Sequence, residues 1–349
     1  MTKKYIEMIK PKKLKSGDTI AIVAPSASLG ALFPHRVQNA VIALTKLGFK
    51  VITYPTTEKN LDGNAGTPEE RAKDLQNAFE NVNVRAIICN IGGITSNQIL
   101  KHLNFKSIRK NPKIFCGYSD ITILHYALAK KASLTTFYGP CAMTQFGEYP
   151  KPLSYTVEYF LKSLTKSEPI GEVLPSEEWT DEVLDWKQKL DLTRPRKLKF
   201  NDDAHIWIKK GNAKGKIIGG CLYSLLQLKS TKYDLDYKDK ILFIETPEGQ
   251  DFSKGETLSY VDSQITDLTN ADIFDKIKGL IVGRGFGYTK EEREKFKQIV
   301  EKHTNDYNFP VLFNVNIGHT DPIITLPINI EVTLDSDKNK FVIEEAGVI

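Results

Sequence analysis

Long apolar runs, metal-spaced cysteines and a strong excess of one charge are all missing from this sequence of 349 residues. No apolar run approaches the roughly 18–20 residues that span a bilayer, so we expect no membrane segment. The four cysteines lack metal-ligand spacing and three lie in apolar runs, which indicates reduced thiols, no metal site and a cytoplasmic location. The formal net charge is only +5, without a basic stripe, and therefore does not favour nucleic-acid binding.

The first residues also lack the apolar core of a secretory leader. They carry positive charge, but the charged residues from Glu7 to Lys15 interrupt every apolar stretch. Hydrophobic residues make up 41% and charged residues 26%, as in folded rather than disordered proteins. Because the length exceeds the roughly 250–300 residues at which one hydrophobic core stops growing, we expect two domains.

Residues 1–150 alternate between strand and helix patterns and predict an α/β domain. The clearest helix start is at Thr67, where a hydroxyl N-cap is followed by Pro68 and then by Glu70. Strands separated by helices imply right-handed crossovers and a parallel sheet that is covered on both faces. The apolar runs predicted as strands are residues 19–24, 51–54, 84–89, 113–117 and 134–137.

Residues 151–212 connect this domain to a second one. The periodic pattern fades here, and an acidic stretch carries Trp179 and Trp186. We interpret the stretch as a functional loop or lid; a surface helix whose tryptophans pack on the body is the alternative. Residues 213–349 read as the second unit, with strands near 216–218, 240–245, 279–282 and 310–315, helices near 221–229, 257–269 and 289–303, and a terminal antiparallel hairpin.

Polar residues typical of acyl-transfer enzymes follow several of these strands. Gly92-Gly93, Ser119, Glu245 and His319 each lie where a predicted strand ends. Ligands of open α/β sheets collect at the carboxyl ends of the strands, so these residues can meet. A serine nucleophile needs a base, and the base needs an orienting acid, which His319 and Glu245 can supply.

Each of these residues also has a plain structural interpretation. Ser119 can be a helix N-cap, His319 a loop histidine bonded to the backbone, and Glu245 a member of a structural ion pair. Gly92-Gly93 can be a simple turn or, with the N–H of Asp120, an oxyanion hole. Their coincidence at strand ends favours catalysis.

Several motifs occur in order along nearly the whole chain: residues 14–26, Gly92-Gly93, residues 117–120, Tyr138-Gly139-Pro140, residues 219–222, Glu245 and Gly318-His319. Together they resemble the LD-carboxypeptidase family of serine peptidases. The resemblance implies a triad of Ser119, His319 and Glu245, with an oxyanion hole from the Gly92-Gly93 region and the Asp120 N–H. It also implies an N-terminal domain like class I glutamine amidotransferases, a smaller α/β C-terminal domain, a cytoplasmic homodimer and no cofactor.

Within that family, the tryptophan-containing segment is similar to the microcin C self-immunity branch. Members of this branch cleave the amide between an aminoacyl or peptidyl group and a nucleotide. Trp179 or Trp186 would then stack on the base, a contact worth about 1–3 kcal/mol. Cys221 departs from the Asn that many relatives carry, which leaves a substrate contact at that position open.

Two other functions stay open from the sequence. The first is a murein tetrapeptide carboxypeptidase that releases a terminal D-alanine from the L-centre of a diamino acid. Arg284 is then the candidate partner of the free carboxylate. The second is a non-catalytic module that binds a small peptide or nucleotide, with Ser119 as an N-cap.

Overall fold

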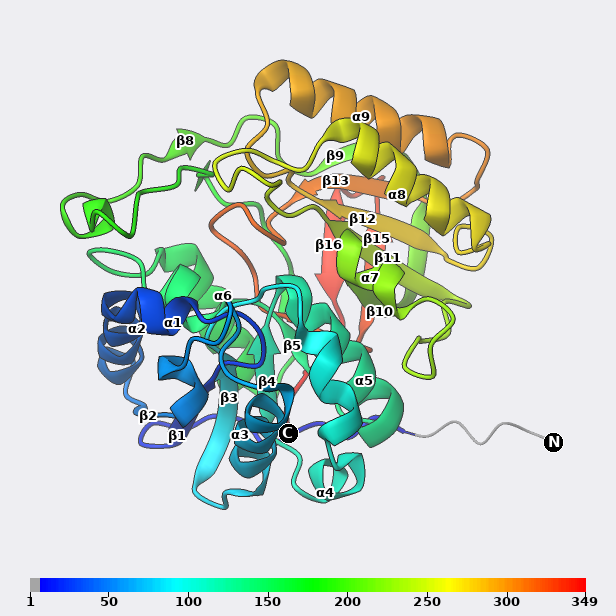
Figure 1. The fold of residues 1–349 in the computed structure, drawn as a ribbon. Helices are drawn as coiled ribbons and strands as arrows, with labels where there is room; N and C mark the ends of the chain where they lie inside the picture. Colours follow the sequence, from blue (N-terminus) through cyan, green and yellow to red (C-terminus); the bar gives the residue numbers. More distant parts are fainter. Residues whose placement is uncertain (1–6) are drawn as a thin grey trace.

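Two halves, each built around its own sheet, make up the chain (Figure 1). The computed structural model describes residues 7–349, so residues 1–6 of the segment assessed for a secretory leader lie outside it. The predicted α/β class, with a parallel sheet in the N-terminal half, is confirmed. The domain boundaries at residues 150 and 213 stay a prediction.

The first sheet has the strand order β14-β5-β4-β3-β1-β2, and all its neighbours except β14 pair in parallel. The fifth strand begins later than predicted, because Leu134 makes only an isolated bridge with Ile9. The edge strand β14 comes from the far end of the chain and is antiparallel to β5. The strands are β1 (Thr19–Val23), β2 (Lys50–Thr53), β3 (Val84–Cys89), β4 (Ile114–Gly117), β5 (Phe137–Tyr138) and β14 (Leu326–Pro327).

Both faces of this sheet are buried, as predicted. Ile20 and Ile22 of β1 pack in one cluster with Leu44, whereas Ala21, which points to the opposite face, packs in another with Leu75. The helices of this half are α1 (Leu29–Leu32), α2 (Pro34–Lys46), α3 (Pro68–Glu80), α4 (Phe105–Lys110), α5 (Thr122–Ala132) and α6 (Ser154–Thr165), with the 3-10 helices η1 (Pro55–Glu58), η2 (Ser96–His102) and η3 (Ser119–Ile121) and the π-helix η4 (Ala142–Phe146).

Two helices begin with capping boxes, one of them at the helix start predicted at Thr67. At α3, the Thr67 hydroxyl accepts the Glu70 N–H at 3.2 Å, and the Glu70 carboxylate accepts the Thr67 N–H at 3.0 Å. Thr289 and Glu292 make the same reciprocal pair at the start of α9 (Lys290–Thr304). Each box satisfies amides that the first turn of a helix leaves unpaired.

The second sheet has the order β6-β16-β15-β10-β11-β12-β13-β9, with β10 to β13 parallel and the outer strands antiparallel. The predicted helices and the terminal hairpin β15–β16 are confirmed, whereas β6 and β9 were not expected. The elements are β6 (Gly171–Glu172), β9 (Ile206–Lys209), β10 (Asn212–Cys221), α7 (Leu222–Leu228), β11 (Lys240–Glu245), α8 (Leu258–Asn270), β12 (Gly279–Gly283), α9 (Lys290–Thr304), β13 (Val311–Val315), β15 (Glu331–Asp335) and β16 (Lys340–Ile343).

The tryptophan-containing segment forms an extended arm at one side of the molecule (Figure 1). Its only regular elements are the ribbon of β7 (Glu178–Trp179) and β8 (Lys199–Phe200) and the single turn η5 (Leu190–Leu192). The surface helix of the alternative interpretation is therefore wrong, but both tryptophans pack on the body as that interpretation expected. The sequence pattern also missed α6, which buries Tyr159 and Phe160 just before this arm.

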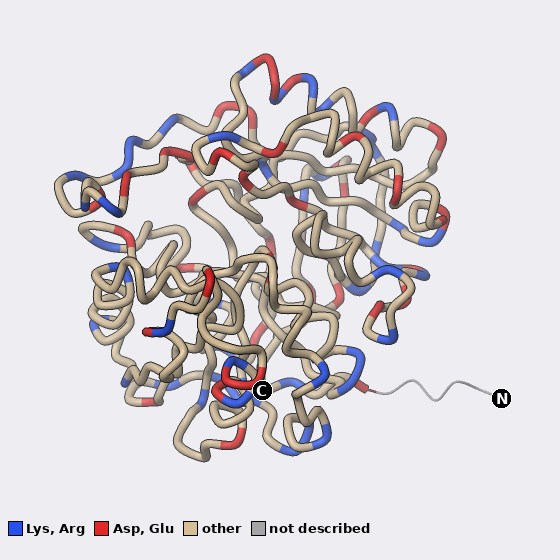
Figure 2. Tube along the Cα trace, viewed as in Figure 1, with Lys and Arg blue, Asp and Glu red and all other residues tan. Residues whose placement is uncertain are grey.

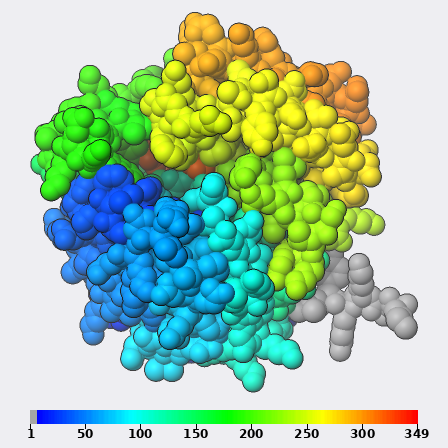
Figure 3. Space-filling view, viewed as in Figure 1, coloured from blue at the N-terminus to red at the C-terminus, as the bar shows by residue number. Residues whose placement is uncertain are grey.

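Charged residues of both signs alternate along α9 and the outer loops (Figure 2). Within residues 7–349, no helix has the length and apolar character that would let it cross a membrane. The space-filling view is hollowed along the junction of the two halves, and atoms of the C-terminal part of the chain show at its floor (Figure 3). The strand ends that carry the candidate residues belong to both halves, so this junction positions the site.

Candidate active site

Ser119 lies on a sharp turn directly after β4. Its backbone has φ +64°, a left-handed conformation that costs a non-glycine residue about 1–3 kcal/mol. Its amide donates to the Tyr138 hydroxyl at 3.0 Å, and its hydroxyl contacts a histidine rather than capping a helix. A Cβ on Gly92 would lie 3.0 Å from the Ser119 Cβ, so any larger residue there would push against the serine. The turn therefore projects the hydroxyl into the space between the two halves.

His319 joins the serine to a carboxylate. Its Nε2 lies 3.0 Å from the Ser119 Oγ, and its Nδ1 lies 2.7 Å from Oε2 of Glu245. Gly318 precedes it with φ +106°, and a Cβ there would be 2.6 Å from that same carboxylate oxygen. A glycine at this position lets the loop after β13 approach Glu245 closely enough to present the imidazole.

Glu245 ends β11 and is fully buried. Oε2 faces His319, and Oε1 accepts a hydrogen bond from the Tyr138 hydroxyl at 2.5 Å. Both oxygens therefore have partners, which is the condition for keeping a charge inside a protein. Burial and the Glu245 charge raise the pKa of Tyr138 well above its usual value. The phenol therefore stays protonated and can donate the hydrogen bond to Glu245.

The pKa of His319 reflects two opposing effects. Burial lowers it, but the charges of Glu245 and Glu248 outweigh burial and raise the pKa to about 9. Glu248 contacts the opposite ring nitrogen from Glu245, with its Oε2 at 3.3 Å from Nε2. The imidazole thus lies between two carboxylates and can carry a proton at neutral pH.

Two backbone amides point to a candidate oxyanion hole. Hydrogen bonds within residues 7–349 leave the N–H groups of Gly93 and Asp120 without an acceptor. Gly93 has φ +145°, and a Cβ there would lie 2.4 Å from the Ser26 hydroxyl. The Asp120 carboxylate accepts from Ser26 at 2.6 Å and from the Ser96 amide and hydroxyl at 2.9 and 2.8 Å. It thereby ties the loops after β1 and β3 to the turn that carries Ser119.

The arm brings Trp179 and Arg284 together, away from open solvent. Trp179 is buried, with the guanidinium of Arg284 4.4 Å from its ring centroid and the Lys199 ammonium at 4.6 Å. Arg284 is also buried, and its charge is paired with Asp203 at 2.5 Å. The sequence could not indicate these pairings, since Asp203 lies 81 positions earlier in the chain.

Trp186 is placed differently. It is partly exposed and packs edge-on against Phe33 at 5.6 Å, with the Arg36 guanidinium 4.5 Å from its ring. Arg36 in turn pairs with Asp191 of the arm at 3.1 Å. The tip of the arm is therefore attached to the N-terminal half.

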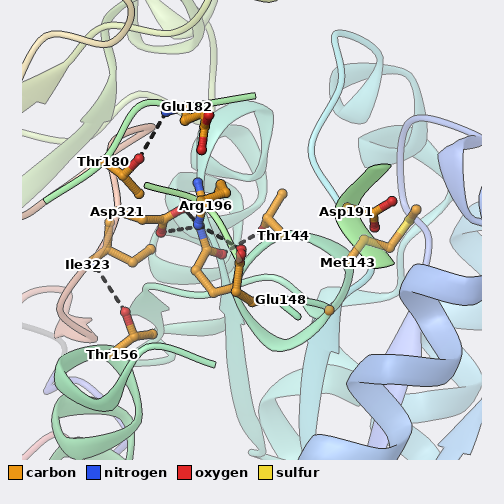
Figure 4. A network of polar contacts seen from close by, with 12 residues as sticks. Met143, Thr144, Glu148, Thr156, Thr180, Glu182, Asp191, Arg196, Asp321 and Ile323 are labelled. Carbon is orange, nitrogen blue, oxygen red and sulfur yellow. Dashed lines mark hydrogen bonds and ion pairs between the residues drawn. The ribbon is translucent and has the colours of Figure 1, made fainter. Parts of the chain in front are cut away.

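A second attachment lies next to the histidine loop (Figure 4). Arg196 of the arm contacts Asp321 at 2.7 Å and Glu148 at 2.8 Å. Burial acts to lower the pKa of Arg196, but the charges of Asp321 and Glu148 raise it by more than burial lowers it. The net effect is a raised pKa, so the guanidinium stays charged. Asp321 also exchanges backbone hydrogen bonds with Thr180. Since Asp321 follows His319 by two positions, the arm and the imidazole share one support.

Metal ligands are not gathered anywhere in the described chain: within residues 7–349, no three His, Cys, Asp or Glu side chains could hold an ion. Cys221, which follows the Gly219-Gly220 pair at the end of β10, is buried beside Glu245. Burial and the charges of Glu245 and Glu248 raise its pKa well above the usual value, so it presents a neutral thiol.

Family models now identify the chain. The LD-carboxypeptidase N-terminal domain matches residues 20–139, and the LD-carboxypeptidase C-terminal domain matches residues 214–334. The chain belongs to the LD-carboxypeptidase family. It is a serine-type carboxypeptidase, as predicted.

Relatives of this LD-carboxypeptidase carry two kinds of name. The putative carboxypeptidase YocD of Bacillus subtilis is 33% identical over 90% of this chain and 93% of its own length. The microcin C7 self-immunity protein MccF of Escherichia coli is 31% identical over 95% of this chain and 94% of its own length. A probable murein peptide carboxypeptidase of Bacillus subtilis is 28% identical over 97% of this chain and 95% of its own length.

Solved structures agree with this family assignment. MccF without ligand superposes with a TM-score of 0.89 at 29% identity, covering 98% of this chain and 100% of that chain. An MccF-like protein from Bacillus anthracis superposes with a TM-score of 0.85 at 36% identity, covering 97% of this chain and 99% of that chain. MccF has also been solved in complex with glutamyl sulfamoyl guanosine and with aspartyl sulfamoyl adenosine.

Proposed function

We propose that this LD-carboxypeptidase hydrolyses amides with a Ser119–His319–Glu245 triad. The observation that carries the proposal is the continuous chain of hydrogen bonds from the Ser119 Oγ through both imidazole nitrogens to Glu245. The turn at Ser119 and the free amides of Gly93 and Asp120 support it, because a nucleophile needs an acceptor for the charge it creates.

The reaction has two steps. Neutral His319 takes the Ser119 proton at Nε2 as Oγ attacks the scissile carbonyl carbon, and the oxyanion rests on the two amides. The carbon–nitrogen bond then breaks, and His319 gives the proton to the leaving nitrogen, which leaves an ester on Ser119. Water attacks this ester with His319 again as base, releasing the acid and restoring the serine. Glu245 orients the imidazole and stabilises its protonated form.

For the substrate, we propose an amide between an aminoacyl or peptidyl group and a nucleotide. The overall similarity to MccF, whose structures contain aminoacyl sulfamoyl nucleosides, supports this class. Of the two predicted tryptophans, Trp186 is the better candidate for base stacking, since its side chain is partly exposed, whereas Trp179 is buried.

A murein tetrapeptide is the second candidate, favoured by the murein peptide carboxypeptidase of Bacillus subtilis. A site for this substrate needs a cationic side chain that binds the terminal carboxylate of the peptide. Arg284, the predicted partner, already pairs with Asp203, which weighs against this substrate. The homodimer and the cytoplasmic location remain part of the proposal.

One incubation distinguishes the candidates. A murein tetrapeptide and an aminoacyl sulfamoyl adenosine are mixed with wild-type protein or with Ser119→Ala, and the products are analysed by mass spectrometry. We expect release of the nucleoside by the wild type only, with at least about a thousandfold loss in the variant. Loss of D-alanine alone would favour the murein substrate. Equal turnover by Ser119→Ala would refute the triad, and no labelling of the wild type by a serine-directed probe would favour a binding module.

Ser230→Ala is the matched control. Ser230 also has a left-handed backbone, with φ +62°, but follows α7 on the surface. It reports what removing a hydroxyl from such a turn does to stability, without touching the site.

A further inference from the structure

Glu248 is a carboxylate of the reaction centre that the triad does not need. It lies in the loop between β11 and α8, its side chain is 34% exposed, and its Oε2 is 3.3 Å from the His319 Nε2. Within residues 7–349 its side chain has no other ion pair or hydrogen-bond partner. The same nitrogen lies 3.0 Å from the Ser119 Oγ. A single N–H at Nε2 therefore faces two competing oxygen atoms.

Cations near this centre are already paired. Arg284 contacts Asp203, and Arg196 contacts Asp321 and Glu148. Cys221 next to the site is neutral. The charge that the cleft offers to a ligand beside the nucleophile is consequently the negative charge of Glu248.

The position of Glu248 indicates which part of the substrate its negative charge faces. Glu248 belongs to the C-terminal half and lies within one contact of the triad. Trp186, the candidate for the nucleotide, packs on Phe33 and Arg36 of the N-terminal half. A group that reaches Glu248 therefore comes from the residue that supplies the scissile carbonyl.

We propose that Glu248 is a specificity-determining residue that binds an amine or guanidinium on the acyl residue of the substrate. The ion pair draws the carboxylate away from Nε2, so that His319 serves Ser119 alone. The preferred acyl residue is one with a cationic side chain, such as lysine or another diamino acid, and an acidic one is disfavoured by repulsion. This inference rests on the proposed amidase function but holds for either leaving group.

The test uses three conjugates that differ only in the acyl side chain: lysyl, norleucyl and glutamyl sulfamoyl adenosine. With the wild type we expect kcat/KM for lysyl to exceed that for norleucyl by about tenfold or more, with glutamyl the slowest. Because the cation also frees Nε2, part of this advantage appears in kcat. Glu248→Gln removes the lysyl advantage, and Glu248→Lys makes glutamyl the preferred substrate.

Asp251→Asn is the control, since Asp251 lies in the same loop and its contacts are Ser253 and Lys254 of that loop. It keeps the wild-type ratio. Equal rates for all three conjugates, or a lysyl preference that survives Glu248→Gln, would overturn the inference while the amidase function stands. If no conjugate is hydrolysed, the proposed nucleotide-conjugate substrate fails, whereas the triad is still tested by hydrolysis of the murein tetrapeptide. Calorimetric binding to Ser119→Ala then decides the inference alone, since equal affinities for lysyl and norleucyl conjugates contradict it.

Discussion

Tyr138 donates its hydroxyl proton to the one oxygen of Glu245 that His319 does not contact. The same hydroxyl accepts the backbone N–H of Ser119 at 3.0 Å. One phenol thus connects the backbone of Ser119 with the carboxylate of Glu245, the first and last members of the proposed triad. The sequence motif around Tyr138 contributed to the family resemblance, but nothing in it indicated this contact.

Tyr138→Phe is expected to lower kcat roughly tenfold to a hundredfold, because a buried carboxylate loses a hydrogen bond worth about 1.5–3 kcal/mol. Steady-state kinetics and thermal unfolding measure the effect. Tyr126→Phe is the control, since Tyr126 is buried in α5 and its hydroxyl has no hydrogen-bond partner within residues 7–349. Equal losses in the two variants would show that Tyr138 matters only for packing.

The raised pKa of His319 predicts the pH dependence of activity. With a pKa of about 9 in the free enzyme, kcat/KM rises with pH and levels off above that value, because only neutral imidazole takes the Ser119 proton. Glu245, Glu248 and Asp321 are the carboxylates whose charges raise this pKa. Glu248→Gln should therefore shift the acid limb to lower pH. An unchanged limb would contradict the role of Glu248.

The contribution of His319 to the free energy of unfolding decreases as the pH rises, whereas activity increases. The pKa of His319 is higher in the folded chain than its ordinary value of 6.5, so the folded state binds the proton more tightly. This contribution is complete below about pH 6.5 and is lost as the pH rises through about 9. Denaturant unfolding of wild type and His319→Gln across this range measures it; parallel curves would show that the histidine does not contribute.

Gly92→Ala tests the space around the nucleophile. The added Cβ would lie 3.0 Å from the Ser119 Cβ and 3.2 Å from its Oγ, so the serine must shift. We expect kcat to fall about a hundredfold, together with slower labelling by a serine-directed probe. Gly63→Ala is the control, because its Cβ meets nothing within 4 Å; with φ +81° it reports the cost of backbone strain alone, away from the site. Normal labelling of the Gly92 variant would mean that the turn adapts.

Arg196→Met tests the support that the arm gives to the histidine loop. Removing the guanidinium leaves Asp321 and Glu148 facing each other without their shared cation, which should cost about 3–5 kcal/mol of unfolding free energy. Activity falls as well, because Asp321 positions the loop of His319. Arg194→Met, which breaks the exposed pair with Glu182, should change little. Similar effects of the two variants would argue against a shared support.

Much of the site could be anticipated because its geometry follows from parallel strands. Ser119, Glu245 and His319 lie at strand ends, and the structure brings them within hydrogen-bonding distance; their catalytic roles stay a proposal. The contacts of Arg284 and Glu248 could not be anticipated, because they depend on irregular loops whose conformations no periodic pattern describes. The same applies to β14, a two-residue strand too short to leave a signal.

That short strand has a consequence for how the halves work together. The chain leaves β13 in the second sheet, passes through His319 and enters β14 in the first sheet. His319 therefore belongs to the connection between the halves, while Ser119 and Glu245 are each anchored in one of them. The proposed triad is therefore assembled by the docking of the two halves, and a rotation between them would separate its hydrogen-bonded members without unfolding either half.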